Sequence, residues 1–243
     1  MSDSYVALEK DRLLKSNRVG VVIVAAGQST RMNGEDKTFI DILGLPLIAH
    51  TIRPFELSDK VHEIVLVLPQ NSLERGKLLI TDEEYNKVSG VYRGGITRQD
   101  SVKLGLEALT SCEWVIIHDG ARPCVTQDLI DAGLESVKNT GATIAGVPVT
   151  DTIKIVTESN LIEDTLPRDT LWAAQTPQIF KYDILLHAHN STNDSYTDDA
   201  AMLEQLGYQV TLFKGSYANI KMTTPEDVPL IKTILQSRKI THQ

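Results

Sequence analysis

The 243-residue sequence lacks the features of several protein classes. Its two cysteines, Cys112 and Cys124, provide neither a disulfide framework nor a C-x-x-C motif. No segment approaches the roughly 20 apolar residues of a membrane span. The first 18 residues carry charges throughout and lack the apolar core and cleavage site of a secretory signal. The sequence therefore predicts a cytoplasmic protein.

Basic residues are in the minority, because 24 Lys and Arg stand against 32 Asp and Glu, for a net charge of −8. Broad binding to nucleic acid or to an anionic membrane favours a basic surface, so we expect neither partner. An anionic ligand is still compatible with this charge, because the local field at a site need not follow the total. The composition, 42% hydrophobic and 23% charged, is that of an ordinary globular protein.

Apolar runs alternate with helical patterns along the chain. Continuous apolar runs predict strands at 19–25, 62–69, 113–119 and 208–213. Apolar spacing of three and four residues predicts helices at 44–57, 101–110 and around 129–137, and Thr224 and Pro225 predict the N-cap and first position of a last helix. Such alternation indicates a mostly parallel sheet covered on both faces. Ligands of such sheets bind beyond the carboxyl ends of the strands.

One stretch, residues 147–172, departs from this alternation. Apolar and polar residues alternate around Ile153 and Ile155, and a Glu-Ser-Asn turn follows. This pattern predicts a hairpin or arm inserted into the α/β unit. We expect a single domain over 19–243, preceded by an N-terminal extension, residues 1–18, that is either a short helix or disordered.

The first apolar run ends in unusually small residues, in the segment VVIVAAGQSTRM. Ala25, Ala26 and Gly27 leave main-chain N–H groups accessible, and Arg31 and Lys37 add two cations nearby. Main-chain donors with cations are what a polyphosphate needs. A strand-to-helix turn with surface cations is the alternative. The segment has neither the G-x-G-x-x-G of dinucleotide folds nor the G-K-[ST] of a P-loop.

Three later motifs have the same character. YRGGITRQDSV places paired glycines before Ser101 and a helix. VIIHDGARP ends a strand on Asp119, and a lone carboxylate there suits Mg²⁺, which usually takes one or two protein carboxylates beside phosphates. NIKMTTPED supplies Lys221. Taken singly, these motifs equally suit a loop, a turn Asp paired with Arg122, and a solvated lysine. His118, on the buried strand, is more typical of a core residue than of a ligand.

Seven motifs in order carry a resemblance to a known family: AAGQSTRM with its following lysine, GGITRQDSV, HDGARP, VPVTDTIK, LPRDTLWAAQTPQIF, TDDA and NIKMTTPEDV. Together they resemble the 2-C-methyl-D-erythritol 4-phosphate cytidylyltransferases, from about residue 19 to about residue 235. The resemblance implies a Rossmann-like nucleotidyltransferase sheet flanked by helices, with an extended β-hairpin arm. It also implies that a cytidylyl group passes from CTP to a polyol phosphate, with release of pyrophosphate.

The resemblance further implies a role for each matching residue. Nucleotide binding would fall to Ala25, Ala26, Gly27, Gly95, Ser101 and Asp119, and Asp119 would also face the implied cofactor, Mg²⁺. Catalysis would fall to Arg31, Lys37 and Lys221. Binding of the polyol phosphate would fall to Arg122, Arg168, Thr176, Thr197 and Lys221. In the implied homodimer, the arm at 147–172 would cross to the partner, and Arg168 and Thr176 would reach in from the neighbouring subunit.

The sequence departs from the family pattern at three places. Ser29 replaces a second glycine, Asp36 replaces a proline before the lysine, and Ala218 stands where an acidic residue often precedes NIK. Other functions therefore stay open: ribitol 5-phosphate cytidylyltransferase, a sugar-nucleotide synthase with another base, and a non-catalytic nucleotide-binding module. The missing glycine fingerprint disfavours an NAD-dependent oxidoreductase.

Overall fold

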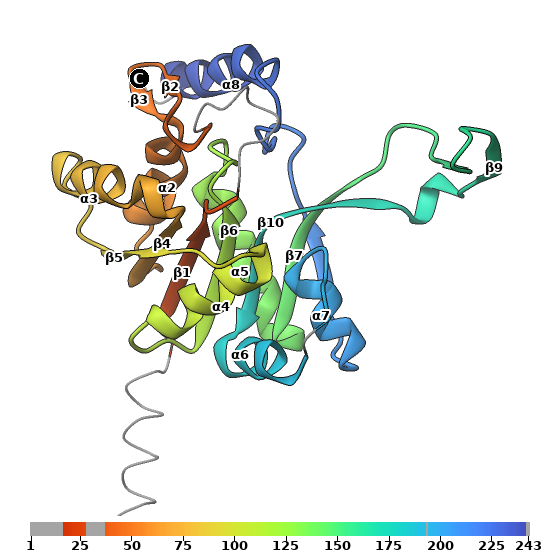
Figure 1. Ribbon diagram of the computed structural model, residues 1–243, viewed down its shortest axis with the longest axis horizontal. Coiled ribbons are helices and arrows are strands. Elements are labelled where there is room, and N and C mark those ends of the chain that lie inside the picture. The colour runs from red at the N-terminus through yellow and green to blue at the C-terminus, as the bar shows by residue number, and fades with distance from the viewer. Residues whose placement is uncertain (1–16, 28–36, 193, 242–243) are drawn as a thin grey trace, which may run out of the picture.

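The structure is a computed structural model that describes residues 17–27, 37–192 and 194–241. Figure 1 shows a central sheet with helices on both sides and an arm that projects from it. The strands are β1 (Val19–Val24), β2 (Asp41–Ile42), β3 (Leu45–Pro46), β4 (Glu63–Leu68), β5 (Val88–Arg93), β6 (Trp114–Asp119), β7 (Ala142–Pro148), β8 (Lys154–Val156), β9 (Ile162–Thr165), β10 (Trp172–Lys181) and β11 (Thr211–Lys214). The helices are α2 (Leu47–Leu57), α3 (Leu73–Asp82), α4 (Arg98–Ala108), α5 (Gln127–Thr140), α6 (Tyr182–Ser191), α7 (Asp199–Gln205) and α8 (Asp227–Thr241), with 3₁₀ turns η1 (Lys37–Phe39), η2 (Gln70–Ser72) and η3 (Arg168–Thr170).

The central sheet has seven strands in the order β11-β7-β10-β6-β1-β4-β5. All neighbouring pairs run parallel except those of β10, which is antiparallel to both β6 and β7. The predicted mostly parallel sheet is therefore confirmed. Because β1, β4, β5 and β6 run in the same direction, their carboxyl ends share one edge of the sheet, where ligands of such folds bind.

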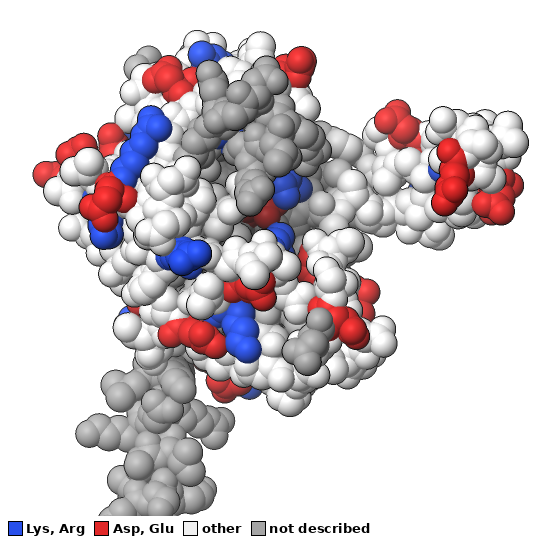
Figure 2. Space-filling model, in the orientation of Figure 1, with Lys and Arg blue, Asp and Glu red and all other residues white. Residues whose placement is uncertain are grey.

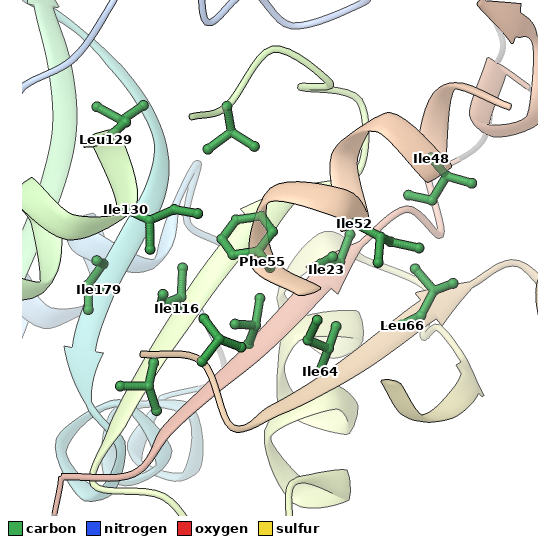
Figure 3. Close-up of a cluster of buried hydrophobic side chains, with 14 of the residues drawn as sticks. Ile23, Ile48, Ile52, Phe55, Ile64, Leu66, Ile116, Leu129, Ile130 and Ile179 are labelled. Atoms are coloured by element: carbon green, nitrogen blue, oxygen red, sulfur yellow. The ribbon is translucent and has the colours of Figure 1, made fainter. Parts of the chain in front are cut away.

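Strand β1 shows why the sheet lies at the centre of the core. All six of its residues are buried, and successive side chains point to opposite faces. Val21 and Ile23 pack in a cluster with α2, α3 and α5, which Figure 3 shows around Phe55. Val22 and Val24 pack on the other face in a cluster with α4, α6 and α7. Helices cover both faces, so every residue of the strand can be apolar.

Helix α4 begins at Arg98, three residues before the predicted start. The Thr97 hydroxyl accepts a hydrogen bond from the Asp100 main-chain nitrogen, and the Asp100 carboxylate accepts one from the Thr97 nitrogen. This capping box satisfies two main-chain donors that the helix itself leaves unpaired. It also places Arg98 and Ser101 in the first turn, beside the carboxyl ends of the strands. No helix in the described ranges is long and apolar enough to cross a membrane.

Other predicted boundaries also differ from the structure. The helix predicted over 44–57 begins at Leu47, because Leu43 and Gly44 adopt positive φ angles of 57° and 89° and form the turn between β2 and β3. The strand predicted at 208–213 begins at Thr211. The last helix begins at Asp227, so Thr224 and Pro225 form a turn before it rather than its first positions.

The predicted hairpin within 147–172 is confirmed. Strands β8 and β9 pair in antiparallel fashion and form a separate two-stranded sheet that projects from β7 and β10. The arm exposes large apolar side chains, Val156, Leu161 and Ile162 among them. Figure 2 shows acidic side chains gathered at its outer end. The assignment of this arm to dimerisation, and the division of the chain at residue 18, stay predictions.

The turn before α8 yields a prediction about stability. The Asp227 carboxylate accepts hydrogen bonds from the main-chain nitrogens of Thr223 and Thr224 at 2.7 and 2.9 Å, and from the Thr223 hydroxyl at 3.0 Å. Asp227→Ala removes these bonds, so we expect the free energy of unfolding at pH 7 to fall by about 1–2 kcal/mol. Urea denaturation of both proteins measures the difference.

The same difference should depend on pH. Partial burial by itself raises the pKa of Asp227, but the hydrogen bonds from Thr223 and Thr224 outweigh it and lower the pKa below its ordinary value. A carboxylate with a lowered pKa stabilises the fold above the unfolded pKa, and the stabilisation is lost as the pH falls. The difference in the free energy of unfolding between the wild type and Asp227→Ala should therefore become smaller below about pH 4. A gap that widened in acid would contradict this account.

Candidate functional site

A cleft of about 780 Å³ lies at the carboxyl ends of the parallel strands. Its walls come from the residues after β1 and β5, from η1, from the first turns of α4, from the end of β6 and from the segment before α8. The lining includes Ala25, Ala26, Gly27, Lys37, Gly94, Gly95, Arg98, Ser101, Asp119 and Lys221. The cleft therefore places four cations, Lys37, Arg93, Arg98 and Lys221, beside small residues and apolar side chains such as Leu47 and Ile96.

Close packing of small residues explains the bare walls of the cleft. A Cβ atom on Gly94 would lie 2.2 Å from the Cβ of Ala26, and one on Gly120 would lie 2.5 Å from the Cβ of Ala25. Real Cβ atoms do not approach so closely, so the main chains after β5 and β6 can lie against the end of β1 only because these two positions are glycine. The small residues thus serve both packing and access.

Ser101 holds the loop that follows β5. Its hydroxyl donates to the Thr97 carbonyl at 2.9 Å and accepts from the Gly95 nitrogen at 3.1 Å. Ser101 is almost fully buried. Its hydroxyl hydrogen is therefore already used within the protein, and Ser101 shapes the wall of the cleft through its loop.

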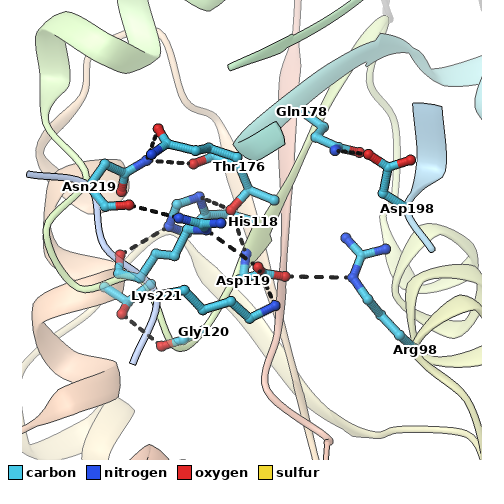
Figure 4. Close-up of polar contacts among 12 residues, drawn as sticks. Arg98, His118, Asp119, Gly120, Thr176, Gln178, Asp198, Asn219 and Lys221 are labelled. Atoms are coloured by element: carbon cyan, nitrogen blue, oxygen red, sulfur yellow. Dashed lines mark hydrogen bonds and ion pairs between the residues drawn. The ribbon is translucent and has the colours of Figure 1, made fainter. Parts of the chain in front are cut away.

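Three cations surround the carboxylate of Asp119 (Figure 4). Lys221 Nζ lies 2.8 Å from Oδ2 of Asp119, and Arg122 Nε lies 3.4 Å from the same oxygen. Arg98 Nε lies 3.5 Å from the other oxygen, Oδ1, and approaches from the opposite side. Burial by itself raises the pKa of Asp119, but the charges of Lys221, Arg98 and Arg122 outweigh it and hold the pKa below its ordinary value. Asp119 is therefore ionised at neutral pH.

Arg98 is held from behind by a second carboxylate. Its Nη1 donates to Oδ2 of the buried Asp199 at 2.8 Å, and His189 Nε2 lies 3.3 Å from the other oxygen of Asp199. Charge-assisted hydrogen bonds of this length are strong, and Asp199 is 1% exposed. Arg98 is therefore a cation with a fixed position, whereas Lys221 is 41% exposed and reaches into the cleft on a flexible stem.

A buried polar layer lies under Asp119. The Asp119 nitrogen donates to Thr176 Oγ1 at 3.0 Å, and this hydroxyl contacts His118 Nδ1 at 3.1 Å. Asn219 Nδ2 donates to the Thr176 carbonyl at 2.8 Å, and the Asn219 carbonyl accepts from Arg122 Nη1 at 2.7 Å. Strands β6 and β10 and the segment before Lys221 are therefore joined directly beneath the cleft (Figure 4).

The structure brings most of the predicted site residues together. Ala25, Ala26, Gly27, Lys37, Gly95, Ser101, Asp119 and Lys221 line one cleft, and Arg122 lies against Asp119. Arg31, Ser29 and Asp36 fall outside the described residues. Thr197 is exposed and does not line the cleft. Arg168 lies in the arm, in η3, where its Nη1 donates to the Thr150 carbonyl at 2.8 Å.

The structure corrects the expectation that Thr176 reaches into a neighbouring subunit. Thr176 is 4% exposed, and its hydroxyl is hydrogen-bonded to Asp119 and His118 of its own chain. It lies on β10, in the central sheet rather than in the arm. Arg98 and Asp199 were missed by sequence reasoning. Arg98 has a local signal, since it opens the helix after the glycine pair, but nothing in the sequence indicates its partner.

Fold and cleft together define an open α/β protein with a cleft at the carboxyl ends of its parallel strands, lined in part by Lys37, Arg98 and Lys221. The family model of 2-C-methyl-D-erythritol 4-phosphate cytidylyltransferase matches residues 19–237. The chain belongs to this family, whose members are cytidylyltransferase enzymes.

Individual relatives agree with the family match. The 2-C-methyl-D-erythritol 4-phosphate cytidylyltransferase of Dehalococcoides mccartyi strain CBDB1 is 46% identical over 221 residues, which cover 91% of this chain and 97% of the relative. That of Alkaliphilus oremlandii is 44% identical, with 92% and 97% coverage. Among solved structures, the Francisella tularensis enzyme has a TM-score of 0.75 at 30% identity, over 89% of this chain and 99% of its own. The 4-diphosphocytidyl-2C-methyl-D-erythritol synthase of Anaerococcus prevotii has a TM-score of 0.79 at 27% identity, over 90% and 98%.

Proposed function

We propose that this protein transfers a cytidylyl group from CTP to 2-C-methyl-D-erythritol 4-phosphate. The products are 4-diphosphocytidyl-2-C-methyl-D-erythritol and pyrophosphate. The proposal rests on the cleft, which brings Lys37, Lys221 and Asp119 together beside accessible main chain in a chain of this family.

The reaction is a direct displacement at phosphorus. An oxygen of the polyol phosphate forms a bond to the α-phosphorus of CTP, and the bond from that phosphorus to the bridging oxygen of the β-phosphate breaks. The electron pair leaves with pyrophosphate. Because the second pKa of a phosphate monoester is about 6, the attacking oxygen is already ionised at neutral pH. The step therefore needs no general base.

The barrier in this reaction is the repulsion between two anions. Lys37 and Lys221 line the same cleft, so their charges can stabilise the phosphates as negative charge accumulates on them. We propose that Lys37 acts at the α-phosphate and the leaving pyrophosphate, and that Lys221 lies between the two substrates. Arg31 would join Lys37 at the triphosphate. Arg98, fixed by Asp199, adds a further positive charge to the wall of the cleft.

The nucleotide subsite is proposed at the ends of β1 and β5. Ala26 and Gly27 offer main-chain groups on one wall, whereas the Ala25 nitrogen already donates to the Val67 carbonyl at 2.8 Å. The loop around Gly95 forms the other wall. The Ser101 hydroxyl accepts one hydrogen bond from this loop and donates another to it. Ser101 would therefore keep this wall in place for the cytidine.

Asp119 is the proposed contact of Mg²⁺. It is the only carboxylate among the described lining residues, and no described group of three or more His, Cys, Asp or Glu is arranged to hold a metal. Mg²⁺ usually binds one or two carboxylates together with substrate phosphates, so this donor set fits a metal that arrives with the triphosphate. Bound there, Mg²⁺ would neutralise part of the phosphate charge.

This arrangement predicts that Mg²⁺ binding depends on the nucleotide. Three cations already surround Asp119, so we expect no measurable heat when Mg²⁺ alone is titrated into the protein, and clear binding when CTP is present. Isothermal titration calorimetry tests this expectation. The heat of Mg²⁺ binding in the presence of CTP is compared between the wild type and Asp119→Asn. Binding of bare Mg²⁺ that disappears in Asp119→Asn would contradict the prediction.

The polyol phosphate is proposed to bind beside Asp119, at Arg122 and Lys221. Arg168 and Thr197 would complete this subsite. Arg168 does not line the cleft of its own chain, and the arm that carries it exposes apolar side chains. We therefore propose a homodimer in which Arg168 is contributed by the partner subunit. Thr176 would support the site from beneath through Asp119.

One assay tests the proposed function against its alternatives. The protein is incubated with Mg²⁺, each nucleoside triphosphate and each candidate polyol phosphate, and pyrophosphate release is measured. We expect release with CTP and 2-C-methyl-D-erythritol 4-phosphate. Release with ribitol 5-phosphate instead, or with another nucleotide, would assign the protein to a different transferase. No release with any pair would indicate a non-catalytic nucleotide-binding module.

A further inference from the structure

His118 is a buried side chain to which the proposed reaction assigns no role. It lies on β6 directly before Asp119, with no exposed surface, and its ring packs against Phe55 at 5.0 Å between centroids. Both ring nitrogens have partners. Nδ1 lies 3.1 Å from Thr176 Oγ1, and Nε2 lies 3.2 Å from the Arg122 carbonyl oxygen. The ring therefore joins the two ends of the Asp119–Arg122 turn.

The direction of each hydrogen bond follows from its partner. A carbonyl oxygen can only accept, so Nε2 of His118 must carry the hydrogen that is donated to Arg122. Thr176 Oγ1 accepts from the Asp119 nitrogen, which leaves its own hydrogen to be donated to His118 Nδ1. Every donor in the chain from Asp119 through Thr176 and His118 to Arg122 then meets an acceptor.

The same layer includes the segment that carries Lys221. The Asn219 carbonyl accepts from Arg122 Nη1 at 2.7 Å, and the Met222 nitrogen donates to the Ala121 carbonyl at 2.8 Å. The turn after β6 therefore holds the irregular segment on either side of Lys221 through one side-chain and one main-chain hydrogen bond. A shift of this turn would move groups on both sides of the cleft.

We propose that His118 is a positioning residue, which fixes the Asp119–Arg122 turn from beneath so that Asp119 faces the nucleotide and Arg122 faces the polyol phosphate. The proposal rests on the proposed function for the roles of Asp119 and Arg122. His118 itself touches neither substrate, because Asp119 and Thr176 separate its ring from the cleft.

Three substitutions separate the two hydrogen bonds of the ring. His118→Phe keeps the ring but removes both bonds, and we expect kcat/KM to fall about 10- to 100-fold, as displacement of catalytic groups does. In His118→Asn, the amide oxygen can still accept from Thr176, so the KM for CTP should recover. In His118→Gln, the amide nitrogen can still donate to the Arg122 carbonyl, so the KM for the polyol phosphate should recover.

A buried control separates positioning from general destabilisation. Val137→Ala lies on α5, away from the cleft, and should lower the unfolding temperature while turnover stays at the wild-type level. The activities of the His118 variants are compared with that of Val137→Ala at one temperature. Urea denaturation at that temperature first establishes that every variant is folded in the assay buffer. Unchanged kcat and KM in folded His118→Phe would overturn the proposal. The proposal would also be overturned if His118→Asn and His118→Gln had the same KM increase for CTP and the same KM increase for the polyol phosphate.

The tautomer gives a measurement that does not depend on activity. Nitrogen NMR of the histidine rings, with His118→Phe identifying the signal among six histidines, should show the hydrogen on Nε2 and a bare Nδ1. A hydrogen on Nδ1 would overturn the proposal. Wild-type protein that has the expected tautomer but releases no pyrophosphate would contradict the proposed function alone.

Discussion

Lys37→Ala is expected to lower kcat about 10²- to 10³-fold, the effect of removing one preorganised group that stabilises developing charge. Lys37 lines the cleft with Lys221 and Asp119, at the start of η1. If its charge acts mainly on the pentavalent phosphorus and the departing pyrophosphate, the interaction strengthens in the transition state. The KM for CTP should therefore change much less than kcat. Steady-state kinetics with CTP varied at saturating polyol phosphate measures both constants.

A matched control comes from a lysine on the far edge of the sheet. Lys214 is exposed at the end of β11 and does not line the cleft, so Lys214→Ala removes the same charge from the protein without touching the site. We expect wild-type kinetics for it. A Lys37→Ala protein that turns over at the wild-type rate would remove Lys37 from the mechanism, and a KM effect alone would reduce its role to binding.

Complementation between two inactive variants should restore activity if Arg168 acts on the partner's site. Arg168→Ala and Lys37→Ala are each expected to reduce turnover at least about 100-fold. A heterodimer of the two has one site with both residues intact and one with neither. Co-expression with two different tags, followed by purification on both, isolates it. We expect about half of the wild-type activity per dimer, because one of two sites is complete.

The alternative outcome is equally clear. If Arg168 serves the cleft of its own chain, each subunit of the heterodimer lacks one essential residue, and activity stays at the level of the single variants. Sedimentation of the wild-type protein provides the control, since a fully active monomer would refute a site shared between subunits. The arm exposes apolar side chains such as Leu161 and Ile162, which the proposed dimer would bury.

The fold was predictable where local pattern decides it. Continuous apolar runs identified β1, β4 and β6, because strands buried on both faces need no polar alternation. Most of the cleft was predictable for a related reason. Ala25 to Gly27 follow β1, Asp119 ends β6, and parallel strands bring these ends to one edge of the sheet. Residues 44–46 were mispredicted as the start of α2, since Leu45 and Pro46 suit a hairpin strand as well as a helix.

The supporting contacts of the site could not be predicted from the sequence. Arg98 and Asp199 are 101 positions apart, and Thr176 and His118 are 58 apart. Each of these side chains is compatible by itself with a surface or core position, and only the order of strands in the sheet brings the partners together. The antiparallel insertion of β10 next to β6 is what places Thr176 under Asp119.

The stereochemical course at the α-phosphorus tests the central claim, direct attack by the substrate phosphate, most directly. CTP with one sulfur on the α-phosphorus, as a single diastereomer, is converted with 2-C-methyl-D-erythritol 4-phosphate, and phosphorus NMR assigns the product configuration. A single in-line displacement between cations in the cleft predicts inversion. Retention would require two displacements, hence a covalent intermediate on the protein, and would contradict the account.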